Sequence, residues 1–300
     1  MSRTLLGFIL LLVIVVTLGV VLAQSRSSSP SSHGRVSVVA AENFYGNIVS
    51  QIGGPHVSVT SILSDPNADP HLFEPGSRNG LAVSQAALVI QNGVGYDSFM
   101  QKLEDADPSS HRIVVTIGDV LGVSAADANP HLWYDVPKLG RVATAIASGL
   151  GRADPAHRSA YRAGLVRFQS RLAPLRREVT ALRARYGGTP VAYTEPVPGY
   201  LLAAAGLRSL TPPAFARAIE DGSDPSPEAV AQMTALFTHH RVRVLLYNNQ
   251  TVSPITTRIR TAAQAAGIPV VGVSETMPPG LTFPAWQLGQ AQALERALRQ

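Results

Sequence analysis

Two histidines of this chain, His71 and His131, stand in the same local frame. Residues 69–75 read DPHLFEP and residues 129–135 read NPHLWYD, so each histidine follows a polar residue and a proline and precedes leucine and an aromatic residue. A proline restricts its own backbone and that of the residue before it. The repeated frame indicates that both imidazoles are held stiffly, as a pair that must meet at one point would be.

Two carboxylates complete a possible metal site. Glu195 follows the β-rich run PVAYT and Glu275 follows PVVGVS. Two imidazole nitrogens and two carboxylates are a plausible ligand set for a divalent transition metal ion, and their summed charge of about −2 balances M²⁺. Either glutamate alone is typical of a helix cap or of the surface, so the hypothesis depends on the combination.

Three neighbouring residues are candidates to support these ligands. Asp69 and Asn129 precede the two Pro-His pairs, and we expect them to orient the imidazoles as hydrogen-bond acceptors. Glu74 is the nearest competing ligand, although a role in the first turn of a helix fits it as well. The remaining histidines stand in the spacer, at turns or at helix ends and are interpreted as structural: His33, His56, His111, His157, His239 and His240.

Short β-rich runs that alternate with helical stretches position these residues. Such alternation predicts parallel sheets covered on both faces, with ligands bound beyond the carboxyl ends of the strands. The predicted strands are 35–41, 57–63, 88–93, 111–117, 189–194, 242–248 and 268–274. The predicted helices are 43–53, 80–87, 98–106, 199–206, 226–240, 253–267 and 284–300, and residues 118–130 are predicted to be a loop.

Residues 154–186 break this alternation. Apolar residues recur there at spacings of four and three, which predicts one helix of about 50 Å. Pro174 predicts a kink, and Gly187-Gly188 ends the pattern. A helix packed along its own protein fits better than a coiled-coil seam. The stripe consists of Tyr161, Leu165, Phe168, Leu172, Leu175, Val179, Leu182 and Tyr186.

The predicted fold class is therefore α/β, with two β/α lobes, each built on a mainly parallel sheet, joined by one long helix, and with the metal site in the cleft between them. The N-terminus is predicted to be an export segment, because Arg3 precedes nineteen mostly apolar residues, Leu5 to Ala23. The predicted parts are a signal or membrane anchor (1–23), a Ser-rich spacer (24–35), a first lobe (36–150), a linking helix (151–187) and a second lobe (188–300).

Composition narrows the function. The chain has no cysteine, which excludes disulfides, thiolate catalysis, cysteine-based zinc fingers and a lipid-modified cysteine. The formal charge of +5 is local: residues 152–186 hold nine arginines against two acids, which leaves about −2 for the rest. This favours a solvated helix face over a patch that binds nucleic acid or a membrane. The sequence contains no G-x-S-x-G, Walker P-loop, G-x-G-x-x-G or H-E-x-x-H motif.

These motifs resemble the zinc- and manganese-type solute-binding proteins of metal ABC transporters. NADPHLFEP is similar to the family's D-P-H-x-[FY]-E-P element and NPHLWYD to its second histidine element. AYTEPVPGYLLAAAGL and VVGVSETMPPG are similar to its third and fourth ligand elements, and the likeness covers about residues 36–300.

The resemblance implies metal ligands at His71, His131, Glu195 and Glu275, with one Zn²⁺ or Mn²⁺ ion as cargo. It also implies delivery to an ABC permease with its cytoplasmic ATPase. Three departures stand out: no lipid-bearing cysteine, no histidine in residues 118–130, and glutamate as the third ligand. Glutamate adds a hard oxygen that favours manganese, while raw affinity favours zinc, so both metals stay open.

We expect a monomeric, non-enzymatic protein outside the cytoplasm, in the cell envelope, secreted or anchored to the outer face of the plasma membrane. The N-terminal segment would provide the membrane contact, and no nucleic-acid partner is expected. Two alternatives stay open. A membrane-anchored metallohydrolase would use three protein ligands, a water molecule and a nearby general base. A surface adhesin would only present the basic helix.

Overall fold

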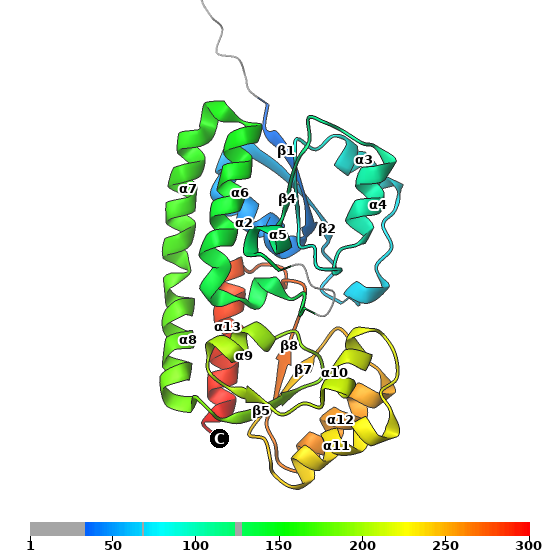
Figure 1. Cartoon of the computed structure of the whole chain (residues 1–300). Helices are drawn as coiled ribbons and strands as arrows, with labels where there is room; N and C mark the ends of the chain where they lie inside the picture. Colours follow the sequence, from blue (N-terminus) through cyan, green and yellow to red (C-terminus); the bar gives the residue numbers. More distant parts are fainter. Residues whose placement is uncertain (1–33, 68, 124–127) are drawn as a thin grey trace, which may run out of the picture. The chain divides into compact units, whose positions relative to one another are not determined.

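Two parallel sheets carry the strands of this chain in a computed structural model, which describes residues 34–67, 69–123 and 128–300 (Figure 1). The predicted signal or anchor, and nearly all of the predicted spacer, lie outside the described residues. Within the described part, no helix combines the length and the apolar character needed to cross a bilayer. Residues 35–300 form one compact unit.

The first lobe is built on a four-stranded sheet in the order β2-β1-β3-β4, with every pairing parallel. Central β1 pairs Val38 with Val59 of β2 and with Leu88 of β3. The strands are β1 (Val36–Glu42), β2 (Val57–Leu63), β3 (Leu88–Gln91) and β4 (Ile113–Thr116). The helices are α2 (Asn43–Gly53), α3 (Ser77–Ser84), α4 (Phe99–Ala106), α5 (Ile117–Leu121) and α6 (Leu139–Ala153).

The second lobe repeats this design, with a parallel sheet in the order β6-β5-β7-β8. Its strands are β5 (Pro190–Tyr193), β6 (Arg208–Ser209), β7 (Leu245–Asn248) and β8 (Val270–Val273). Its helices are α9 (Gly199–Ala204), α10 (Pro213–Glu220), α11 (Pro227–Thr238), α12 (Pro254–Ala265) and α13 (Phe283–Leu298). Short 3₁₀ turns are η1 (Gly54–His56), η2 (Pro70–Leu72), η3 (Leu132–Tyr134), η4 (Val136–Lys138) and η5 (Pro155–His157).

The predicted linking helix is present as two helices that run end to end, α7 (Arg158–Arg171) and α8 (Ala173–Tyr186) (Figure 1). They meet at Leu172, two residues before Pro174, which has no N–H for the bond that would continue the helix. The helix is therefore interrupted near Pro174, the position at which the sequence predicts a kink. The apolar stripe faces inward, since six of its eight residues are buried and the other two are partly buried.

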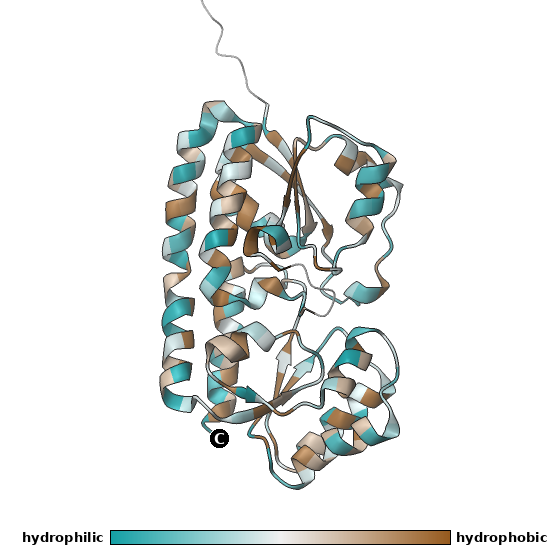
Figure 2. Cartoon of the chain, in the orientation of Figure 1, coloured by the Kyte–Doolittle hydropathy of each residue, from teal (hydrophilic) through white to brown (hydrophobic). Residues whose placement is uncertain are grey.

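The chain itself covers this stripe, because α7 packs on α2 and α6 while α8 packs on α13. One continuous cluster of buried apolar side chains joins Val38 of the first sheet, Phe168 and Leu175 of the long helices, and Val271 of the second sheet. Figure 2 shows the matching distribution of apolar residues on the strands and on the inner sides of these helices. The packing agrees with a helix laid along its own protein.

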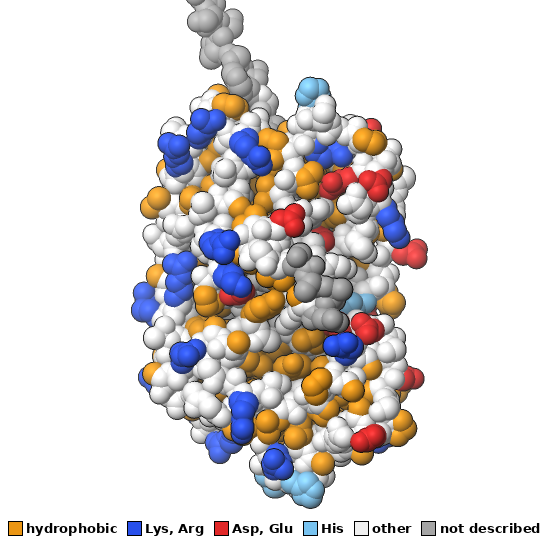
Figure 3. All heavy atoms as spheres, viewed as in Figure 1, with side chains coloured by type: hydrophobic (Ala, Val, Ile, Leu, Met, Phe, Trp, Pro, Cys, Tyr) orange, Lys and Arg blue, Asp and Glu red, His pale blue; other side chains and the backbone are white. Residues whose placement is uncertain are grey.

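The arginines of residues 152–186 lie on the solvent side of α7 and α8, except Arg152, which belongs to the end of α6. All nine of them, from Arg152 to Arg185, are exposed. Figure 3 shows the basic side chains spread along the side of the molecule formed by α7 and α8. The predicted solvated helix face is consistent with this exposure.

Four helices and strands of the structure were not predicted from the sequence. Helix α5 occupies the start of the predicted loop 118–130, of which residues 124–127 lie outside the described part. Helix α6 runs to Ala153, past the predicted lobe boundary at residue 150, and its three glycines weaken the helical signal. Strand β6 has two residues and α10 begins after a pair of prolines, so neither offers a periodic pattern long enough to read.

Candidate metal centre

His71 lies in η2, a single turn in the segment that follows β2. Asp69 caps this turn: its Oδ1 accepts a hydrogen bond from the backbone N–H of His71 at 2.9 Å. Pro70, at the first position of the turn, is buried. The side chain of His71 is 22% exposed. Asp69 thus positions His71 through its backbone and not through its ring, in the way that an aspartate closes a local turn.

His131 is fixed by the side chain of Asn129. Oδ1 of Asn129 accepts hydrogen bonds from the backbone N–H of His131 at 3.0 Å and from its ring Nδ1 at 2.7 Å. An amide oxygen can only accept, so Nδ1 carries a proton, and Nε2 presents its lone pair when the ring is neutral. The side chain is fully buried, and Nε2 has no hydrogen-bond partner among the described residues. A buried acceptor of this kind is suited to bind a cation.

Glu195 and Glu275 follow the carboxyl ends of β5 and β8, which lie on either side of β7 in the second sheet. They are 1% and 0% exposed, respectively. Burying two carboxylates in one place is costly unless each is paired or binds a cation. Parallel strands bring their carboxyl ends to one edge of a sheet, and this edge faces the histidines of the first lobe.

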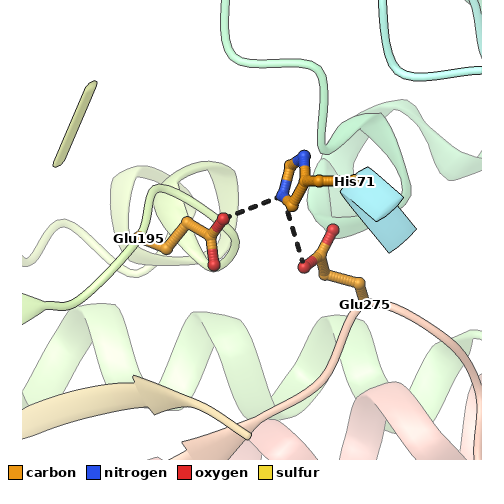
Figure 4. Close-up of side chains that lie close together, drawn as sticks. All are labelled: His71, Glu195 and Glu275. Carbon is orange, nitrogen blue, oxygen red and sulfur yellow. Dashed lines mark hydrogen bonds and ion pairs between the residues drawn. The ribbon is translucent and has the colours of Figure 1, made fainter. Parts of the chain in front are cut away.

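The site forms where these four side chains converge. Nε2 of His71 lies 2.9 Å from Oε1 of Glu195 and 3.9 Å from Oε1 of Glu275 (Figure 4). Each of these three residues offers a ligand atom, and the atoms all lie within 4.8 Å of one another. His131 lies beside this group, with Nε2 at 3.4 Å from Oε2 of Glu275. The structure thus brings three of the predicted ligands together and places the fourth next to them.

A network from β7 and the first lobe holds the carboxylates. The Nδ2 amide group of Asn248, at the end of β7, donates to Oε2 of Glu195 and, at 2.7 Å, to Oε1 of Glu275. The hydroxyl of Tyr96 donates to Oε2 of Glu275 at 3.0 Å. The side-chain oxygen of Gln250 accepts from the backbone N–H of Glu275 at 2.6 Å. Asn248 and Tyr96 were missed, although Asn248 ends a strand, the same signal that identified the glutamates.

Charges at the site depend on one another. Burial lowers the pKa of His71, but its hydrogen bond to Glu195 and the charge of Glu275 outweigh this and raise the pKa to about 10. Burial would raise the pKa of Glu275, yet the imidazoles of His131 and His71 hold it below its usual value. Burial and the charge of Glu275 raise the pKa of Tyr96, so its phenol stays a donor. The carboxylates therefore attract positive charge strongly.

The three supporting candidates have different outcomes. Asp69 and Asn129 each contact the histidine two positions ahead, as described above. Glu74 is exposed, and it is not part of the group of potential ligands among the described residues. The expectation that Glu74 competes as a ligand or supports one is therefore not met in this arrangement, because its side chain faces solvent.

The lobes touch at several polar contacts around the site. Nδ2 of Asn129 donates to the carbonyl oxygen of Pro196 at 2.7 Å, and the hydroxyl of Tyr134 donates to the carbonyl oxygen of Ser274 at 2.7 Å. Asn43 exchanges two hydrogen bonds with the backbone of Met277, at 2.8 and 2.9 Å. These bonds hold the loops that carry the ligands in register across the two halves.

Comparison with known proteins gives a consistent family. The family described as "Zinc-uptake complex component A periplasmic" (ZnuA) matches residues 38–297. The metal ABC transporter substrate-binding lipoprotein SsaB of Streptococcus sanguinis is 27% identical over 186 residues, 58% of this chain and 59% of that protein. The manganese ABC transporter substrate-binding lipoprotein PsaA of Streptococcus pneumoniae is 24% identical over 182 residues, 57% of this chain and 58% of that protein. The chain thus spans less than two thirds of the length of these curated relatives.

The fold also has solved counterparts. The periplasmic zinc binding protein TroA from Treponema pallidum superposes with a TM-score of 0.74 at 20% identity, and the match covers 88% of this chain and 99% of that one. This likeness agrees with the observed arrangement of two sheets and a long connecting helix.

Proposed function

Since the chain belongs to the family of periplasmic zinc-uptake complex components, we propose that it is an extracytoplasmic receptor that captures one divalent transition metal ion, Mn²⁺ or Zn²⁺, and delivers it to an ABC permease. A cytoplasmic ATPase would power that permease. Membership in a family of uptake components agrees with the expectation that the chain is not an enzyme. The cation is cargo in this proposal.

The convergence of His71, Glu195 and Glu275 is the observation that carries this proposal. The imidazole comes from one lobe and the carboxylates from the other, and they lie within ligand distance of one another. Two ionised carboxylates and two neutral imidazoles balance the charge of M²⁺. Binding the cation and holding the lobes together then become one event, because the ligands come from both lobes. The cation also removes the repulsion between Glu195 and Glu275.

A site with four protein ligands explains how the chain can bind the metal ion without catalysing a reaction. Catalytic zinc sites keep one coordination position for a water molecule, whereas a closed ligand set holds the ion. We assign the four positions to Nε2 of His71, Nε2 of His131 and one or both oxygens of Glu195 and Glu275. Asn129 and Asn248 orient these ligands from behind through the bonds already described.

The donor atoms of the site suit two metal ions as cargo. Imidazole suits both Zn²⁺ and Mn²⁺, and carboxylate oxygens add preference for Mn²⁺. PsaA is named for manganese and TroA for zinc. We therefore propose these two ions as the cargo of this chain. We further propose a location on the outer side of the plasma membrane, in keeping with the periplasmic family, with residues 1–23 as the export signal or anchor.

Equilibrium dialysis of chelator-stripped protein tests the proposal. The wild-type protein should bind about one Mn²⁺ or Zn²⁺ per chain, and a His71→Ala/His131→Ala variant should lose that tight binding. A His111→Ala/His239→Ala variant is the matched control, because both of these histidines are exposed and lie outside the cluster. Binding that is equally tight in both double variants would contradict the proposed site.

A further inference from the structure

A pocket of about 330 Å³ lies beside the metal centre, between residues 128–130 and α10. Asn129 and Pro130 line it from the first lobe, and Pro196, the neighbour of Glu195, lines it from the second. Pro213, Arg217 and Asp221, which also line it, are exposed. The pocket therefore extends from the surface of the second lobe to the residues that flank two of the proposed ligands.

Glu220, the last residue of α10, is one of the two carboxylate residues that line this pocket. Its Oε2 atom is buried and has no hydrogen-bond partner among the described residues. Burial of a carboxylate oxygen without a partner costs free energy, so such an oxygen requires an explanation. A position at the end of a helix does not supply one, since the partial negative charge there disfavours an acid.

The charge of Glu220 acts on the site itself. Burial lowers the pKa of His131, but the charge of Glu220, together with a hydrogen bond and the charge from Glu275, raises it. Glu220 also interacts with Glu195 and His71. Glu220 is nevertheless outside the group of residues whose ligand atoms lie together. It is thus close enough to attract a cation that enters the pocket, but it is not placed to be one of the ligands that hold it.

We propose that this pocket is the entry path of the metal ion and that Glu220 is a transit ligand, which binds the incoming cation and passes it to His131 and Glu195. The inference rests on the proposed function, because it assigns a route to the same cargo. A transit ligand lowers the barrier between solution and site, and by microscopic reversibility it does so in both directions. Its removal should therefore slow association and dissociation together and change the equilibrium affinity much less.

The experiment compares Glu220→Gln with Asp221→Asn. Both substitutions remove one negative charge, but Asp221 is exposed and lies outside the group of potential ligands among the described residues. The dissociation rate of Mn²⁺ is measured by stopped-flow transfer to an excess of a fluorescent chelator, and the dissociation constant by equilibrium dialysis. Their ratio gives the association rate. Glu220→Asp, which keeps the charge, should retain most of the wild-type association rate.

For Glu220→Gln we expect the association rate to fall by about tenfold relative to wild type and to Asp221→Asn, the lower end of what local electrostatics supplies. The dissociation rate should fall with it. Association rates that agree within about twofold between Glu220→Gln and Asp221→Asn would overturn the inference. So would a faster dissociation rate in Glu220→Gln, since this marks a resident ligand. Wild-type protein that binds no Mn²⁺ would instead contradict the proposed function itself.

Discussion

Nε2 of His71 lies 2.9 Å from Oε1 of Glu195, although 124 positions separate the two residues in the chain. One belongs to the turn that follows β2 in the first lobe and the other follows β5 in the second. The same imidazole nitrogen lies 3.9 Å from Oε1 of Glu275. A proton and a metal ion therefore compete for one position, between a ring nitrogen and two carboxylates.

This competition predicts the pH dependence of metal binding. The pKa of His71 is raised to about 10, because its bond to Glu195 and the charge of Glu275 outweigh burial. The ring is thus protonated at pH 7, and a cation must displace that proton. The affinity for Mn²⁺ should rise by about tenfold per pH unit between pH 6 and pH 8.

Equilibrium dialysis at pH 6, 7 and 8 measures this dependence. The raised pKa has the opposite effect on the metal-free fold: its contribution to stability is full below about pH 6.5 and is lost as the pH rises through about 10. An affinity that does not change between pH 6 and pH 8 would show that metal binding does not displace a proton from His71.

Asn248 should matter for affinity without touching the metal. Its amide group donates to both carboxylates and aligns them. In Asn248→Ala we expect the dissociation constant for Mn²⁺ to rise by about 10- to 100-fold, as is usual when the partner behind a ligand is removed. Asn249→Ala is the control, because Asn249 is its exposed neighbour and bonds to neither carboxylate. Equal affinities for Mn²⁺ in the two variants would show that Asn248 does not contribute to metal binding.

The positions of the candidate ligands could be predicted from the sequence because the ends of strands can be predicted. β2 spans residues 57–63 as predicted, and β5 and β8 end two residues before Glu195 and Glu275, respectively. The repeated Pro-His frame identified His71 and His131 without knowledge of the fold. These signals are local in the sequence, so they can be recognised without knowledge of the tertiary structure.

Other parts of the site depend on tertiary packing. Glu220 lies on a helix with no diagnostic pattern, and only the folded chain brings it near His131. Asn248 looks like a turn residue in sequence and is buried only because β7 lies between β5 and β8. Glu74 shares the motif of His71 but faces solvent, since the single turn η2 ends before it.

Close packing of α7 against α2 predicts opposite effects for one substitution at two sites. A Cβ added to Gly164 of α7 would lie 2.0 Å from the carbonyl oxygen of Ile52, whereas Gly289 of α13 has nothing within 4 Å. Gly164→Ala should destabilise the fold by about 1–3 kcal/mol. Gly289→Ala should stabilise it by about 0.5–1 kcal/mol through helix propensity. Urea unfolding measures both, and two changes of the same sign would contradict the packing described.

The continuous core predicts limited movement between the lobes. Buried side chains of α7 and α8 join both sheets in one cluster, with no loose hinge segment in these helices. We expect small tilts and ordering of the loops that carry His71 and Glu275. In small-angle scattering, stripped and loaded protein should differ in radius of gyration by less than about 1 Å. A large compaction on loading would show hinge closure instead.

X-ray absorption at the zinc edge tests the central claim most directly. Protein loaded with one equivalent of Zn²⁺ should show two imidazole ligands at about 2.0–2.1 Å together with carboxylate oxygens. His71→Ala and His131→Ala should each leave one imidazole. A spectrum that fits two imidazoles in either variant, or none in the wild type, would contradict a site in which both His71 and His131 bind the ion.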